Sequence, residues 1–102
     1  MATQNPKPEL TGDVDQRLTV DADRAVWREV GDEVVILDVA TGTYLSLNGS
    51  GRLLWKRLDG GATSSELAEE LAKTYGLDPE QAGRDVSQFL ESLSQWQLIV
   101  AM

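Results

Sequence analysis

The sequence predicts an α+β fold, a three-stranded antiparallel β-meander followed by three helices, and two observations lead to this prediction. Between positions 24 and 47 the chain is rich in β-branched and aromatic residues, which form short runs separated by Gly-containing turns. Beyond Asn48 the period of the apolar residues changes from two to 3.6, the period of an α-helix. The length of 102 residues is that of one domain.

Three segments carry the strand pattern. Ala25–Val30 and Glu33–Val39 flank a two-residue Gly-Asp turn, and Thr43–Leu47 follows a second turn that also contains glycine. In the last of these segments Tyr44 and Ser46 alternate with two leucines. Because successive strand residues point to opposite faces, this alternation predicts one buried face and one half-polar face.

The first two helices have recognisable start or stop signals. The first is expected over residues 49–58 and is stopped by Gly60–Gly61. Thr63 is a good N-cap for the second helix, because Glu66 follows at the capping-box spacing. Gly76 ends that second helix.

The third helix is expected from Asp78, an N-cap followed by Pro79 at the first helical position, to about residue 96. Its predicted inner side consists of Ala82, Val86, Phe89, Leu90 and Leu93. The apolar tail Leu98–Val100 is expected to pack back on the core. The three closely spaced helices resemble a helix-turn-helix core, so the fold is winged-helix-like.

The first part of the chain is expected to be an acidic and largely flexible arm over residues 1–23, followed by the folded domain over residues 24–102. The arm contains Pro6 and Pro8 and has a net charge of −3. Its apolar residues are scattered and too few to form a core face: Leu10, Val14, Leu18 and Val20.

The composition excludes most kinds of catalysis. Cysteine and histidine are absent, which removes disulfides, thiol nucleophiles, Cys/His metal sites and imidazole bases. Clustered carboxylates such as Glu66, Glu69 and Glu70 lie in the first turns of predicted helices, where the helix dipole favours negative charge. We therefore expect a binding protein with no catalytic residue, no cofactor and no metal, and a small enzyme is the less favoured alternative.

The charge argues against nucleic acid as a partner. Nine Lys and Arg residues stand against 17 Asp and Glu residues, a formal net charge of −8, so a phosphate backbone would be repelled. The stretch 78–102, which holds the would-be recognition helix, has Arg84 against four acidic residues. A basic peptide is the more natural partner, and a winged-helix DNA-binding regulator is a less favoured alternative.

No part of the chain predicts a membrane segment. No apolar run approaches the roughly 18 residues that cross a bilayer, and the start Met1–Pro6 has no apolar core of a signal peptide. We expect a cytoplasmic protein that contacts neither membrane nor nucleic acid.

A set of residues that runs from the second predicted strand into the third predicted helix resembles the PqqD family, and the resemblance covers about residues 24–100. These residues are Leu37–Asn48, Gly51, Leu54–Trp55, Leu58–Gly60, Thr63, Glu66–Leu67, Leu71, Asp85–Val86, Phe89–Leu90 and Leu93. The chain looks like the stand-alone form of the RiPP recognition element, the domain that binds leader peptides of ribosomally made, post-translationally modified peptides.

The resemblance implies that a leader peptide lies as an added antiparallel strand between the third strand and the third helix. The residues implied in peptide binding are Thr43, Tyr44, Leu45, Ser46 and Leu47 on the strand, and Ala82, Asp85, Val86, Phe89 and Ser92 on the helix. Val86 and Phe89 would offer apolar pockets, and Asp85 would pair with a leader Lys or Arg. The alternative for Val86 and Phe89 is that they only fill the core.

Two roles within the family compete. One is to present a precursor peptide to a radical enzyme in pyrroloquinoline quinone biosynthesis, and the other is to deliver a lasso-peptide precursor to a separate leader peptidase. The aromatic segment Thr43–Asn48 is more similar to the lasso-type partners, so we expect the second role.

Overall fold

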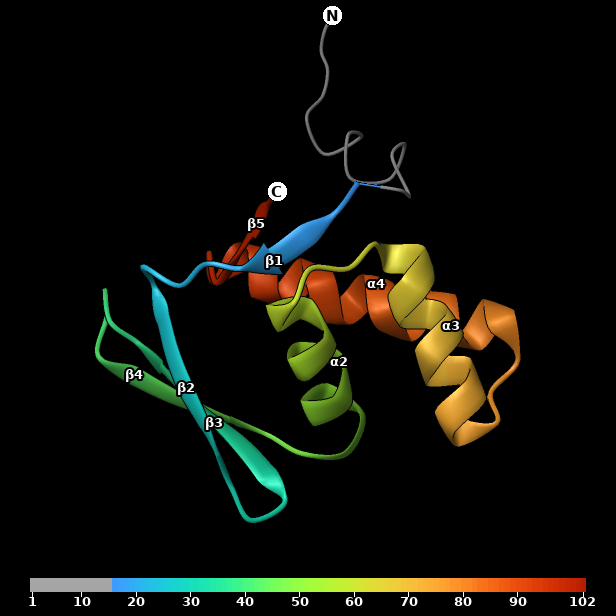
Figure 1. Cartoon of the computed structure of the whole chain (residues 1–102), viewed down its shortest axis with the longest axis horizontal. Helices are drawn as coiled ribbons and strands as arrows, with labels where there is room; N and C mark the ends of the chain where they lie inside the picture. Colours follow the sequence, from blue (N-terminus) through green and yellow to red (C-terminus); the bar gives the residue numbers. More distant parts are fainter. Residues whose placement is uncertain (1–15) are drawn as a thin grey trace, which may run out of the picture.

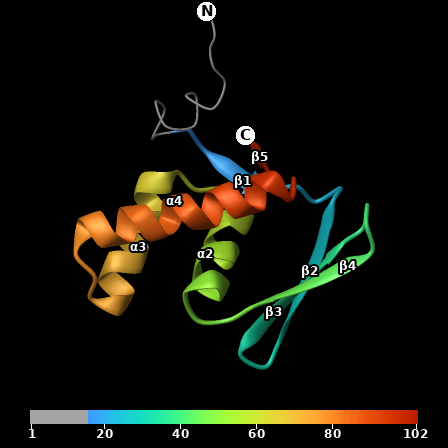
Figure 2. The same ribbon diagram turned by 180° about the vertical axis from the view of Figure 1, so that it is seen from behind.

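The computed structural model describes residues 16–102. Its elements, in chain order, are β1 (Leu18–Val20), β2 (Ala25–Val30), β3 (Glu33–Asp38), β4 (Thr43–Leu47), α2 (Gly49–Asp59), α3 (Ser64–Tyr75), α4 (Pro79–Gln95) and β5 (Ile99–Ala101). The sheet of β2, β3 and β4 occupies one end of the molecule, α3 lies at the other end, and α4 runs across the middle (Figure 1). Figure 2 shows the same arrangement from behind, with α2 between the sheet and α3.

The predicted meander is confirmed. Its strands lie in the order β2-β3-β4 and both pairings are antiparallel. Residues directly opposite each other share a face of the sheet. One face therefore carries Val34 and Ile36 of β3 together with Leu45 and Leu47 of β4. The two β3 residues are fully buried and the two leucines are partly buried, so this face packs toward the helices.

The helix signals are also confirmed. Thr63 caps α3, with its hydroxyl accepting from the Glu66 amide at 3.1 Å and the Glu66 carboxylate accepting from the Thr63 amide at 3.1 Å. Gly76 ends α3 in the left-handed conformation at φ 67°. The Asp78 carboxylate caps α4, and Pro79 is its first residue. These caps satisfy backbone groups that would otherwise lack partners and so define where the helices begin and end.

The arm prediction is wrong for its last residues. Leu18 and Val20 lie in β1, which pairs with β5 of the C-terminal tail, and both side chains are buried. The amide and carbonyl of Leu18 also exchange hydrogen bonds of 2.9 Å with Ala62. The C-terminal tail packs on the core, as expected, and its strand β5 pairs with β1. The residues of β1 are therefore ordered by contacts with the tail and the core and not by contacts within the arm. The folded domain therefore begins before residue 24, and residues 1–15 of the expected arm lie outside the described residues.

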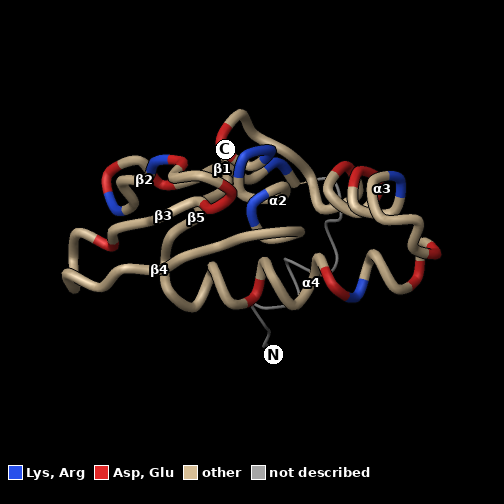
Figure 3. Tube along the Cα trace, turned by 90° about the horizontal axis from the view of Figure 1, so that it is seen from below, with Lys and Arg blue, Asp and Glu red and all other residues tan. Residues whose placement is uncertain are grey.

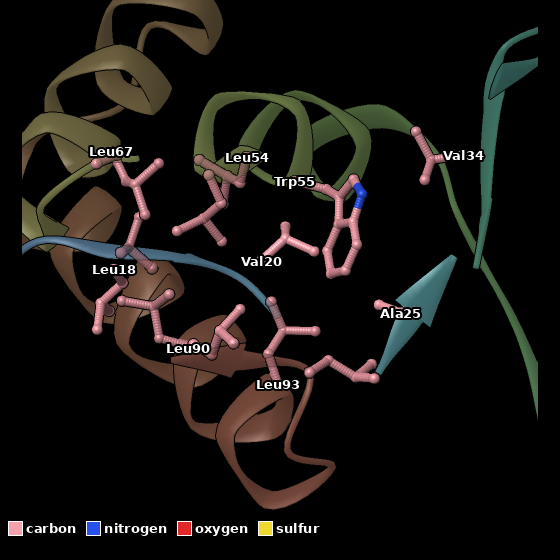
Figure 4. Close-up of a cluster of buried hydrophobic side chains, with 14 of the residues drawn as sticks. Leu18, Val20, Ala25, Val34, Leu54, Trp55, Leu67, Leu90 and Leu93 are labelled. Atoms are coloured by element: carbon pink, nitrogen blue, oxygen red, sulfur yellow. The ribbon is translucent and has the colours of Figure 1, made fainter. Parts of the chain in front are cut away.

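The core is centred on Trp55, which is fully buried. Figure 4 shows its ring directed toward Val20 of β1 and Ala25 at the start of β2. The ring of Trp27 meets it edge to face, with centroids 6.2 Å apart and planes at 88°. Trp96, at the end of α4, is 48% exposed.

Candidate functional site

The strand β4 is an edge of its sheet, because β3 is its one neighbour among the described strands. The other edge, β2, contains Arg28 and Glu29, and charged side chains on an edge strand discourage pairing with another chain. The β4 sequence Thr-Tyr-Leu-Ser-Leu contains no charge. Of the two edges of this sheet, β4 is therefore the better template for an added strand.

The β2–β3 hairpin determines which backbone groups of β3 face β4. In a hairpin closed by a two-residue turn, the two residues that flank the turn exchange backbone hydrogen bonds. The backbone N–H and C=O groups of Glu33 and of the odd-numbered β3 residues after it therefore point toward β2, and those of the even-numbered residues point toward β4. Two bonds just beyond the strands agree with this alternation. The Val39 amide donates to the Arg24 carbonyl at 3.0 Å, and the Gly42 amide donates to the Asp38 carbonyl at 2.7 Å.

The same alternation identifies the free backbone groups of β4. Thr43, Leu45 and Leu47 lie opposite even-numbered residues of β3, so their N–H and C=O groups bond that strand. Tyr44 and Ser46 lie between them and direct their N–H and C=O groups to the open side. Within residues 16–102 no further hydrogen bond engages these two amides. An extended peptide can satisfy both.

Side chains on the inner side of α4 divide into core residues and surface residues. Ala82 and Val86 are 0% and 1% exposed, because the apolar stripe of α4 packs against α3 and the core. They therefore offer no free surface, and the pocket expected at Val86 is a filled part of the core. Phe89 is partly buried at the edge of the core, Asp85 is partly exposed, and Ser92 is exposed.

A cavity of about 310 Å³ lies between the first turn of α2 and the face of α4. It is lined by Ser50, Gly51, Leu54, Leu71, Asp85, Gln88, Phe89 and Ser92. Three of the ten residues expected in the site, Asp85, Phe89 and Ser92, thus meet at one cavity. The sequence interpretation missed its α2 wall, although the Gly-Ser-Gly turn that forms this wall is visible in the sequence.

This cavity, called here the α2–α4 cavity, is continuous with the end of β4. Leu47, the last residue of β4, lies so close to Gly51 that a Cβ atom on Gly51 would be 3.4 Å from the Leu47 Cβ. Figure 3 shows β4 running directly into the chain segment that starts α2, with α4 below both in that view. A strand added to the open edge of β4 would therefore lead toward the cavity.

Asp85 is the carboxylate in the cavity wall. Its Oδ1 accepts a hydrogen bond of 2.9 Å from the side-chain amide of Gln81, one turn earlier on α4. The neighbouring Arg84 donates to the side-chain Oε1 of Gln81 at 3.2 Å and not to Asp85. Among the described residues Asp85 has no ion pair. Within residues 16–102 its negative charge therefore has no cationic partner and receives one hydrogen bond from a neutral amide.

The basic residues of α2 are already paired. Arg52 and Lys56 contact the Glu29 carboxylate at 2.7 and 3.0 Å, and the hydrogen bond from Lys56 is the largest cause of the lowered pKa of Glu29. Arg57 lies 3.5 Å from both Glu66 and Glu70. This cluster therefore does not form a free phosphate-binding surface.

An ion pair joins the sheet to the end of α4. The Arg24 Nε lies 2.8 Å from the Asp38 Oδ1, and its Nη1 donates to the Gln97 side-chain carbonyl at 2.8 Å. Asp38 is 7% exposed, and the hydrogen bond from Arg24 is the largest cause that lowers its pKa. These contacts connect the sheet that carries β4 to the segment that follows α4.

Residues 16–102 contain neither a candidate metal site nor a candidate membrane-spanning helix. No group of three or more acidic, His or Cys side chains there is arranged to hold a metal ion. None of the helices in that range is both long and apolar enough to cross a membrane.

The comparison with known proteins identifies the family. The family model described as Coenzyme PQQ synthesis protein D (PqqD) matches residues 33–99. This match covers more than half of the chain, so the protein belongs to the PqqD family. No curated protein sequence gives a significant match.

Two solved structures have the same fold. "TbiB1 in Complex with the TbiA(beta) Leader Peptide" superimposes with a TM-score of 0.74 at 31% identity and covers 79% of this chain and 93% of that chain. "Lasso peptide synthetase B1 complexed with the leader peptide" has a TM-score of 0.73 at 23% identity and covers 81% of this chain and 96% of that chain. Both similarities confirm the predicted architecture.

Proposed function

We propose that the protein binds the leader region of a ribosomally synthesised precursor peptide as a β-strand added to β4, and presents it to a maturation enzyme. The observation that carries this proposal is the uncharged edge of β4, on which the amides of Tyr44 and Ser46 point to the open side. Its family membership and its 31% identity to TbiB1, described with a bound leader peptide, support the same function.

The alternation of the sheet separates the two faces of the bound peptide. Leader residues that hydrogen bond with Tyr44 and Ser46 direct their side chains to the outer face, where those two residues lie. Leader residues opposite Leu45 and Leu47 direct theirs toward the helices. Every second leader side chain therefore faces α2 and α4, and the backbone supplies affinity while these side chains supply selectivity.

The proposed maturation enzyme is a separate lasso-peptide leader peptidase, and the protein itself is a non-catalytic cytoplasmic partner. The aromatic edge strand with Tyr44 favours this role. Holding the leader beside the peptidase raises the effective concentration of the precursor, because the second encounter becomes intramolecular. The second candidate, favoured by the family model, is the presentation of a peptide to a radical enzyme in pyrroloquinoline quinone biosynthesis.

A reconstitution tests this function. A lasso-peptide precursor and a leader peptidase are incubated with and without this protein, at a precursor concentration below the KM of the peptidase, and cleavage is followed by mass spectrometry. We expect faster cleavage when all three are present and an unchanged precursor mass with the protein alone. Cleavage by the protein alone, or a peptidase rate that ignores its presence, would contradict the proposal.

A further inference from the structure

The α2–α4 cavity lies where a strand added to β4 would place an inward-facing side chain. Leu47 is the last β4 residue on the inner face, and it lies close to Gly51, which belongs to the cavity lining. A leader strand that extends past Leu47 therefore directs its next inward side chain toward the first turn of α2.

The cavity lining has two chemical parts. Leu54, Leu71 and Phe89 are apolar and suit an aliphatic stem. Ser50, Gln88 and Ser92 are polar and neutral, and Asp85 supplies the only charge among the described residues of the lining. A side chain that matches both parts has an apolar stem and a cationic end.

The surroundings of Asp85 favour a cation from outside the domain. Within residues 16–102 its one hydrogen bond comes from the neutral side-chain amide of Gln81, and Arg84 donates to the side-chain oxygen of that same glutamine. Glu29 and Glu66 lie elsewhere in the fold and already have basic partners, so they do not compete for such a cation. Within residues 16–102, no Lys or Arg lines the cavity.

We infer that the α2–α4 cavity is a selectivity pocket for one Lys or Arg side chain of the leader, with Asp85 as the residue that pairs with its charge. This inference rests on the proposed function, since the leader strand on β4 brings the side chain to the cavity. Leaders with a neutral or acidic residue at that position are bound more weakly.

The test uses random peptides, so it does not require the sequence of the natural leader. A displayed library of random dodecapeptides is panned in parallel on the wild-type protein, Asp85→Asn, Glu91→Gln and Ser46→Pro. Asp85→Asn keeps an oxygen that accepts from Gln81. Glu91→Gln removes the same charge from an exposed position of α4 outside the cavity lining and is the matched control.

We expect the wild type and Glu91→Gln to enrich Lys or Arg at one fixed position, and Asp85→Asn to lose that enrichment while keeping the rest of the selected pattern. For a single selected peptide, Asp85→Asn should weaken binding by about 1.4- to 5-fold, the range of a solvent-accessible ion pair, and should reduce its dependence on salt. Asp85→Lys should reverse the preference and bind the peptide in which that Lys is replaced by Glu better than the original.

Two other outcomes are separable. In the first outcome, the selected peptides bind Ser46→Pro more weakly, but they show no enriched Lys or Arg position or keep that enrichment when selected on Asp85→Asn. This outcome would overturn the pocket assignment and leave the added-strand function standing. Wild-type selections whose peptides bind Ser46→Pro equally well would overturn the function and the pocket together.

Discussion

Proline at position 46 tests the assignment of the outward amides on β4. Ser46 directs its N–H to the open side, so Ser46→Pro removes one donor from the proposed ladder with the leader but none from the ladder with β3. An edge strand tolerates proline, and the domain should stay folded. One backbone hydrogen bond contributes about 0.5 to 1.5 kcal/mol net, so binding should weaken by about 2- to 13-fold.

The matched control is Ser46→Ala. Both substitutions remove the bond in which the Ser46 hydroxyl donates to the Glu33 carboxylate at 2.8 Å, but alanine keeps the amide. Titration of a fluorescently labelled leader into the two variants isolates the amide, and circular dichroism checks the fold. Equal affinities of folded Ser46→Pro and Ser46→Ala would refute the proposed alternation or the docking edge.

Three further predictions concern stability and use thermal or denaturant unfolding. Thr63→Ala removes the capping box with Glu66 and should lower the free energy of unfolding by about 0.5 to 2 kcal/mol; a cap that contributes nothing would leave the midpoint unchanged. Leu98→Ala creates a cavity where the tail packs and should cost about 2 to 5 kcal/mol, and a loss below about 1 kcal/mol would mean that the tail is not core. The pKa of Asp38 is lowered from its usual 3.8, chiefly by Arg24, so its contribution to stability is complete above pH 3.8 and is lost as the pH falls through the folded-state pKa. Arg24→Gln should flatten this acid loss, and an unchanged pH profile would disprove the link.

Much of the fold could be predicted because its signals are local. The Gly-Asp turn, the Thr63 capping box and the Asp78–Pro79 start each act within four residues, so the sequence contains them in full. The strand Leu18–Val20 was missed for the opposite reason. Its partner Ile99–Ala101 lies about 80 residues away in the chain, and three-residue strands form only when tertiary contacts bring them together.

The resemblance to the PqqD family indicated Thr43–Leu47 as the strand that holds the peptide. Its place at the end of a meander predicted an open edge, and β4 is such an edge in the structure. Helical periodicity identifies the apolar side of α4 but does not say how deeply each residue sits. It therefore left open whether Val86 lines a pocket or fills the core, and the structure places Val86 in the core. The α2 wall around Ser50 depends on how α2 packs beside α4, which no local pattern specifies.

Backbone hydrogen exchange measured by NMR, with and without a bound leader, tests the central claim most directly. In the free protein the Leu45 amide should exchange slowly because it bonds β3, while the Tyr44 and Ser46 amides exchange fast. Leader binding should slow Tyr44 and Ser46 and leave Leu45 slow. The account would be contradicted if the Tyr44 and Ser46 amides still exchanged fast in the saturated complex and the Trp27 and Glu29 amides of β2 became protected instead.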